Sequence, residues 1–421
     1  MAARDIVITG LGIVSPIGIG GDAFWTALRH GTSGVRPLSL FDAQGLPVTY
    51  GAEVTGFDPK QFVKPRKSLK VMSRDIQFGV SAADMACGQA GLSPGAIDPE
   101  RFGVVFGADM ILCPLDDVEA AYRSCMVDGR FDFRRWGQHA MAQLYPLWML
   151  KYLPNMPACH IAINYDARGP SNSLATAEVS SLLAIAEASR IIERGLADVM
   201  VAGGTSSRIH PTTYVRAVLC DTARQGQDPK TASRPFDADR TGAVYGEGSA
   251  AFVLESRRHA EARGVKIFGR VLGYASGFEP RVNGSPLKGT AIRATIENSL
   301  RCAELEPGDI GHVNANGIST ILDDRAEAQA IRQVLGDVPV TAPKSYFGNL
   351  GAGTGAVEMA ASVLGFVNNE VPRTLNYERR DPQCPVNVVH GEPLRGAKGT
   401  AVILNQASTG QSAAVVIAAE E

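Results

Sequence analysis

Short apolar segments alternate with longer segments of helical spacing along the whole chain. The short segments are rich in valine, isoleucine and glycine, which is typical of buried strands. They read IVITGLG, GVVFGA, DVMVAGG, SAAFVLE, FGRVLGYA, HVNANG, VPVTAPK and TAVILNQ. The longer segments place alanine and larger apolar residues three and four positions apart, as helices with one buried face do. This alternation predicts an α/β fold.

Five helices are predicted from this spacing, and two of them are apolar on nearly every face. The segments SLLAIAEASRII and AVEMAASVLGFV carry few polar residues, so we expect them inside the molecule, between layers. The five predicted helices span Arg74 to Gly91, Glu178 to Arg194, Thr290 to Ala303, Asp324 to Leu335 and Gly353 to Val367.

The pattern is interrupted in two places. Residues 111–158 carry Trp136, Trp148 and four prolines without a clear period, which predicts an excursion that covers a site or meets a partner. The charged segment ESRRHAEARGV follows a predicted strand, and we expect it to separate an N-terminal half, residues 1–255, from a C-terminal half, residues 256–421. No Ser/Gly linker divides the sequence, so the halves must pack tightly. The segment HIAIN, after Cys159, is predicted to be a strand.

Composition excludes several classes of function. The chain has 421 residues, is 45% hydrophobic and carries a formal net charge of -2, so no bulk electrostatic attraction draws it to nucleic acid or to a membrane surface. No segment approaches the ~20 uninterrupted apolar residues of a membrane-spanning helix. The seven cysteines contain no CxxC pair, which argues against a disulfide framework and a metal site. We expect a cytoplasmic protein with no metal and no cofactor.

Five ordered segments carry a resemblance to a known family. The string SRPFDADRTGAVYGEGSAAFVLE, from Ser233 to Glu255, closely resembles a motif of the β-ketoacyl synthases. Four further segments agree in order and spacing: VITGLGIVSPIG, RKSLKVMSRDIQ, ARGPSNSLATAEVSS and KSYFGNLGAGTGAVE. The resemblance implies the thiolase fold, in which two related halves stack in five alternating α and β layers, normally as a dimer.

Three reacting groups of that family are replaced in this sequence. Active members use a cysteine at a helix N-terminus and two histidines to extend an acyl chain delivered by an acyl carrier protein. By the resemblance, Glu178 stands at the cysteine position, and Asn316 and Asn349 stand at the histidine positions. Lys344 and Glu358 match the family's supporting lysine and glutamate. The scaffold is kept and the reacting groups are not.

The replacements remove the chemistry of condensation. A thiolate is a good nucleophile, whereas a glutamate would have to form a mixed anhydride that hydrolyses quickly. An ionised Glu178 would also repel the enolate formed on decarboxylation. Asn316 and Asn349 can donate hydrogen bonds but cannot pass on a proton near neutrality. Lys344 could pair with Glu358 or with Glu178. We expect condensing activity to be absent.

Two further sites follow from the resemblance. The family carries a gating phenylalanine in a glycine-rich loop near the C-terminus, and counting from Asn405 places Thr409 there. The basic residues Arg66, Lys67 and Lys70 correspond to a region that meets the acidic carrier protein. The resemblance thus implies that the basic residues dock a carrier protein, and that the loop at Thr409 lacks the family's aromatic gate.

Three functions remain open from the sequence. The first is a non-condensing partner subunit in fatty acid or polyketide biosynthesis, similar to the chain-length factors, as a heterodimer with an active ketosynthase or as a homodimer. The second is an enzyme with altered chemistry, a malonyl-carrier decarboxylase or an acyltransferase that uses Glu178 as a base. The third is a protein that binds an acyl carrier or a free acyl chain. His312, four residues before Asn316 on a predicted strand, is a candidate replacement base.

Overall fold

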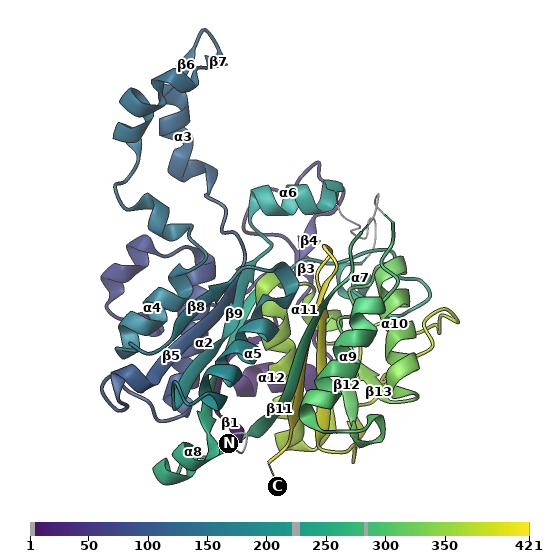
Figure 1. The fold of residues 1–421 in the computed structure, drawn as a ribbon. Helices are drawn as coiled ribbons and strands as arrows, with labels where there is room; N and C mark the ends of the chain where they lie inside the picture. The colour runs from purple at the N-terminus through teal and green to yellow at the C-terminus, as the bar shows by residue number, and fades with distance from the viewer. Residues whose placement is uncertain (1–4, 221–227, 282–284, 421) are drawn as a thin grey trace.

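Most of the strands join in one continuous sheet. The computed structural model describes residues 5–220, 228–281 and 285–420 (Figure 1). Within these residues, 12 strands are linked, and the main path runs β15-β13-β12-β17-β18-β11-β1-β10-β9-β5-β8, with β2 (Gly18–Ile19) added to β1. The N-terminal part of the sheet holds β1 (Ile6–Ser15), β5 (Phe102–Ala108), β8 (Ser171–Leu174), β9 (Val199–Ser207) and β10 (Glu247–Ser256). The C-terminal part holds β11 (Gly269–Phe278), β12 (His312–Asn314), β13 (Pro339–Thr341), β15 (Asn387–Val388), β17 (Thr400–Gln406) and β18 (Gln411–Ala418).

The helices lie in three layers that enclose the two parts of the sheet (Figure 1). Helices α2 (Arg74–Gln89) and α4 (Met156–Tyr165) pack on the outer face of the N-terminal part. Helices α9 (Thr290–Ala303) and α10 (Ile321–Leu335) pack on the outer face of the C-terminal part. Helices α5 (Ser180–Glu193) and α12 (Thr354–Asn368) lie between the two. The predicted five-layer thiolase fold is confirmed.

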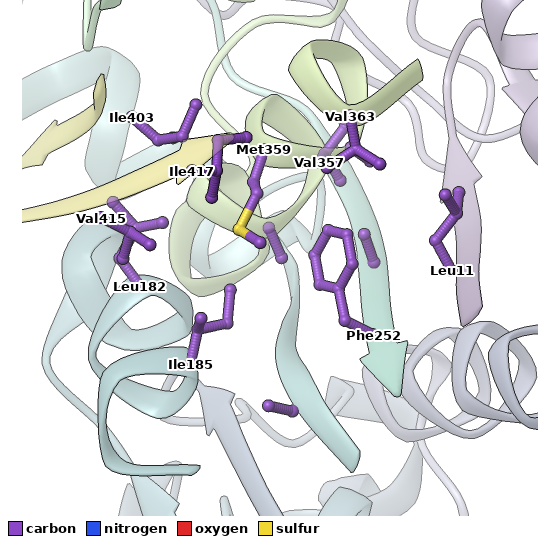
Figure 2. Packing of buried hydrophobic residues seen from close by; sticks show 14 of the residues in the cluster. Leu11, Leu182, Ile185, Phe252, Val357, Met359, Val363, Ile403, Val415 and Ile417 are labelled. Carbon is purple, nitrogen blue, oxygen red and sulfur yellow. The ribbon is translucent and has the colours of Figure 1, made fainter. Parts of the chain in front are cut away.

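The central helix layer explains the two segments that are apolar on every face. Figure 2 shows Leu182 and Ile185 of α5 facing Met359 of α12, with Ile417 of β18 and Phe252 of β10 on either side. Each of these five side chains is at most 1% exposed, and burying one of them stabilises the fold by roughly 1.5–3 kcal/mol. Both helices are covered by strands on two sides, so most of their side chains are buried.

Most predicted elements agree with the structure to within a few residues. Helix α9 has the predicted bounds, and α10 begins three residues earlier than predicted, at Ile321. The prediction for HIAIN is wrong, because this segment belongs to helix α4. The buried side chains of α4 include Ala158, Ile161 and Tyr165, which lie on one helical face against α2 and β5. A short apolar run fits either element until its packing partner is known.

The predicted excursion is an arm that projects from the body (Figure 1). It contains α3 (Leu115–Ser124), the hairpin of β6 (Met126–Val127) and β7 (Arg130–Phe131), and several short 3-10 and π turns up to Lys151. More than half of the large apolar side chains that are exposed in the described residues lie between Met110 and Met149. The arm therefore offers an unusually apolar surface.

The remaining elements connect these layers. Helix α8 (Arg257–Arg263) is formed by the charged segment between β10 and β11, and we infer that the two halves divide there. No described helix has the length and apolar character needed to cross a membrane. The other helices and strands are α1 (Gly21–His30), α6 (Pro211–Cys220), α7 (Pro229–Ala232), α11 (Lys344–Phe347), β3 (Arg36–Pro37), β4 (Tyr50–Gly51), β14 (Glu370–Val371) and β16 (Leu394–Arg395).

Candidate functional site

Glu178 lies in a tight turn that leads from strand β8 into helix α5. Ala177, just before it, has a φ of 54°, a left-handed conformation that is strained for a residue with a side chain. The hydroxyl of Ser180 holds the turn, because its Oγ accepts from the Thr176 N–H at 2.8 Å and donates to the Ala177 carbonyl at 2.6 Å. The turn places the Glu178 side chain inside the molecule, where the residue is 4% exposed.

One carboxylate oxygen of Glu178 is held by two side chains. The Asn349 amide nitrogen donates to Oε1 at 3.1 Å, and the Arg208 guanidinium lies 3.2 Å from the same oxygen. The other oxygen, Oε2, is buried and has no hydrogen-bond partner among the described residues. Of the two predicted histidine positions, Asn349 is the one in direct contact with Glu178.

Arg208 also pairs with Asp109, and the sequence analysis missed both residues. The Arg208 Nε is 3.2 Å from Asp109 Oδ2, which further accepts from Ser206 Oγ at 2.7 Å and from the Ala352 N–H at 3.1 Å. Burial alone would lower the pKa of Arg208, but the Glu178 and Asp109 carboxylates raise it above its ordinary value. Arg208 therefore stays charged between two carboxylates.

A sequence signal for this pair did exist. Asp109 directly follows β5, and Arg208 directly follows β9. These strands pair in parallel, so their carboxyl ends meet at one edge of the sheet. Polar residues that follow neighbouring parallel strands gather there and commonly form a binding site. Both strands were predicted, but their adjacency was not.

Lys344 occupies the centre of a second buried group. Its Nζ donates to Glu358 Oε1 at 2.7 Å and to Asn316 Oδ1 at 3.1 Å. The Asn405 amide donates to the other Glu358 oxygen at 2.6 Å. Burial raises the pKa of Glu358 to about 7, although Lys344 and Asn405 favour its ionised form. Of the two partners that the sequence left open for Lys344, the structure selects Glu358.

Glu327 supports this group from helix α10 and was also missed. Its two carboxylate oxygens accept from the backbone N–H groups of Asn316 and Gly317 at 2.6 and 2.8 Å. Burial raises the pKa of Glu327 to about 8, against the effect of these two donors. The loop that carries Asn316 is thus fixed by a buried carboxyl.

The two groups are joined through helix α11. Lys344 begins this helix and Asn349 follows it, so one short segment supplies a side chain to each group. His312 lies elsewhere: its Nε2 is 3.0 Å from Ser362 Oγ, and it lines a separate cavity of about 170 Å³. Burial lowers the pKa of His312 to about 4.

A pocket of about 510 Å³ opens above Glu178. Thr409 is exposed in the turn between β17 and β18, and it is the neighbouring Ser408 that lines the pocket. The predicted docking residues Arg66, Lys67 and Lys70 are all exposed on the 3-10 helix Arg66–Val71. The polar residues that line the pocket are Asp109, Glu178, Ser206, Ser207, Arg208, Thr213, Arg216 and Ser408.

The arrangement can hold a ligand but contains no strong nucleophile at the turn. Glu178 offers a hydrogen-bond acceptor where a thiol would be needed for acyl transfer. Asn349 and Asn316 are engaged with Glu178 and Lys344, and neither amide titrates near neutrality. The pocket is therefore lined by paired charged side chains, Glu178, Arg208 and Asp109.

Comparisons with known proteins agree with the fold. The β-ketoacyl synthase N-terminal domain matches residues 3–260, and the β-ketoacyl synthase C-terminal domain matches residues 268–378. The chain therefore belongs to the β-ketoacyl synthase family.

Similar proteins include synthases and a solved structure of a ketosynthase/chain length factor. The chain is 34% identical over 396 residues to the 3-oxoacyl-[acyl-carrier-protein] synthase 2 of Synechocystis sp., covering 92% of each chain. The solved structure of the ishigamide ketosynthase/chain length factor matches with a TM-score of 0.87 and 25% identity over 100% of both chains. The solved structure of a type II polyketide acyl-carrier protein in complex with its ketosynthase contains a chain that matches with a TM-score of 0.82 and 27% identity, over 99% of this chain and 100% of that one.

Proposed function

We propose that this protein is a non-condensing ketosynthase homologue that serves as a chain-length-factor-like partner subunit and binds acyl chains in fatty acid or polyketide biosynthesis. The observation that carries the proposal is the buried Glu178 carboxylate, held by Asn349 and Arg208 at the turn where the family places its nucleophile. A carboxylate fixed in this way neither attacks a thioester durably nor stabilises an enolate.

The second buried group supports the same conclusion. Lys344 is committed to Glu358 and to the Asn316 amide oxygen, so its ammonium group stabilises the interior. Asn316 therefore presents no free acceptor for a proton, and the carboxamide does not titrate. The proton transfers that condensation requires have no carrier at either histidine position.

The arm is the part of the chain that we expect to meet a partner subunit. Phe133 is 73% exposed and packs beside an aromatic cluster of Tyr122, Phe131 and Trp136, and Met149, also in the arm, is 53% exposed. Exposed apolar surface of this extent is typical of an interface. A structural relative of this chain is described as a ketosynthase/chain length factor, which makes a ketosynthase the partner to test first.

The decisive experiment is co-expression with an active ketosynthase of this family, followed by native mass spectrometry. We expect a heterodimer, and we expect Phe133→Asp with Met149→Asp to weaken it at least tenfold. Ile163→Asp, an equally exposed apolar position on α4 outside the arm, is the control. A chain that remains a homodimer beside that ketosynthase, or that elongates an acyl group with malonyl units by itself, contradicts the proposal.

Carrier docking at the basic 3-10 helix is tested separately. Charge reversal of Arg66 and Lys67 to glutamate should weaken binding of an acidic acyl carrier protein and reduce its salt dependence. The same reversal at Arg293 and Arg301, which are exposed on α9, serves as the control. Unchanged carrier affinity in the Arg66 and Lys67 variant would remove this docking site.

Decarboxylation of a malonyl-carrier is the second candidate function. Arg208 places a positive charge 3.2 Å from Glu178, which offsets part of the repulsion that an enolate would meet. Incubation with malonyl-carrier and mass analysis for acetyl-carrier decides the point. Formation of acetyl-carrier that is lost in Arg208→Met would favour this candidate over the partner subunit.

A further inference from the structure

Several hydrogen-bond donors that line the pocket of about 510 Å³ are already engaged inside the protein. Ser206 Oγ donates to Asp109 Oδ2 at 2.7 Å. Ser207 Oγ donates to Glu247 Oε2 at 2.8 Å. Arg208 is held between two carboxylates. These donors have partners without a ligand, so they are not the groups that would recognise one.

Three further donors of the pocket are free. The side chains of Thr213, Arg216 and Ser408 line it and have no hydrogen-bond or ion-pair partner among the described residues. Thr213 and Arg216 are three positions apart on α6, so they lie on one face of that helix. Ser408 belongs to the turn between β17 and β18. Arg216 supplies the charge in this group.

The charges of the pocket are distributed unevenly. Glu178, Asp109 and Arg208 form its floor, where two carboxylates share one guanidinium. These three side chains therefore carry one negative charge in excess. Arg216 is exposed and adds a positive charge on the side of α6. An anionic group of a ligand is thus repelled by the floor and attracted toward α6.

The remaining wall of the pocket is apolar. It is formed by Met110, Leu112, Ala175, Ala177 and Ala217. Met110 is 77% exposed, so a ligand that covers it removes a large apolar side chain from water. An apolar wall beside a few polar groups is typical of a site for a small amphipathic ligand. The lining fits an alkyl chain with one anionic head group.

We propose that the pocket binds a free alkyl carboxylate, with its head group on Arg216 and Thr213 and its chain along Met110 and Leu112. This inference rests on the proposed function, because it names the class of acyl chain that is bound. It adds that the chain is held as the ionised acid. A neutral ester makes the same apolar contacts but lacks the charge-assisted hydrogen bonds to Arg216, which makes this arginine a specificity-determining residue.

The test is calorimetric titration of the whole chain at neutral pH with two probes that share one alkyl chain. Octanoate carries a charged head group, and methyl octanoate carries a neutral ester. A charge-assisted hydrogen bond at an exposed side chain corresponds to roughly a tenfold difference in affinity. We therefore expect octanoate to bind about tenfold more tightly at low ionic strength, and less than about threefold more tightly at roughly molar salt.

The outcomes separate this inference from the proposed function. Equal affinities at low ionic strength, or a preference that salt leaves unchanged, would overturn the inference while acyl-chain binding stands. Failure of both probes to bind would overturn the inference together with acyl-chain binding. Neither probe involves a partner subunit, so a failed heterodimer experiment beside a clear preference for octanoate would remove the partner role alone.

A variant and its controls assign the preference to one side chain. In Arg216→Met the preference for octanoate should fall to about twofold or less, while methyl octanoate should bind as it does to the wild type, which shows that the pocket is intact. Arg216→Lys keeps the charge and should retain most of the preference. Arg258→Met removes an exposed arginine of α8 that does not line this pocket, and should retain all of it. A preference that survives Arg216→Met would exclude Arg216 as the cation.

Discussion

Removing the guanidinium that bridges Glu178 and Asp109 is the most direct perturbation of the site. The side chain of Arg208 is 17% exposed, and those of Glu178 and Asp109 are 5% and 19% exposed. Arg208→Met keeps most of the volume and leaves two carboxylates near each other without a cation. Breaking a buried ion pair from one side costs about 3–5 kcal/mol, and the partial exposure favours the lower value. We expect a loss of about 3 kcal/mol.

The assay is thermal unfolding of four proteins in a double-mutant cycle. At roughly 2 cal/mol/K per residue, 421 residues give an unfolding entropy of about 0.8 kcal/mol/K, so the melting temperature of Arg208→Met should fall by about 4 °C. Glu178→Gln should cost about 1 kcal/mol, since its amide oxygen still accepts from Arg208. The double variant should lose about 1–2 kcal/mol less than the sum, because only one of the two carboxylates, Asp109, is then left without its cation.

The matched control is Arg216→Met, an exposed arginine that lines the same pocket. Its melting temperature should stay within about 0.5 °C of the wild type, as expected for a surface position. A shift below 1 °C in Arg208→Met, or strict additivity in the double variant, would refute the view that the Arg208 guanidinium compensates the carboxylates of Glu178 and Asp109.

Three further predictions address the turn, the buried carboxyl and the packing around the floor. Glu178→Cys should be acylated by an acyl-carrier, because the thiol would stand at a helix N-terminus; intact mass should show the adduct, and its absence would argue against this placement. Burial raises the pKa of Glu327 to about 8 from its ordinary 4.5, so the folded state binds more protons than the unfolded state between these values, and the free energy of unfolding falls from about pH 5 to about pH 8. In Glu327→Gln, the fall of the melting temperature over that pH range should become smaller. An unchanged pH dependence of the melting temperature would contradict the raised pKa of Glu327. Gly351→Ala places a Cβ 2.2 Å from Asp109 Oδ2 at a φ of 58° and should lower the melting temperature by several degrees, while Gly308→Ala, which meets nothing within 4 Å, should not; equal melting temperatures would show that the floor is not tightly packed.

The sequence carried the repeating elements and the register of the family motifs. The spacing of apolar residues placed helix α9 at its observed bounds. The motif register put Glu178 and Asn349 at one site although 171 positions separate them, and their side chains lie 3.1 Å apart. Apolar spacing is a local property, and the family motifs occur at fixed positions in the fold. Both can therefore be recognised without knowing which elements pack against them.

The tertiary structure decided what surrounds those residues. Whether HIAIN forms a helix or a strand depended on its packing against α2, because both elements bury short apolar runs equally well. Asp109 and Arg208 became partners of Glu178 only because β5 and β9 pair in parallel, which brings together residues almost a hundred positions apart. The sequence by itself determined which groups stand at the site. Contacts between distant segments decided which charged side chains pair with them and left Glu178 Oε2 without a hydrogen-bond partner among the described residues. Burial and pairing depend on how the layers assemble.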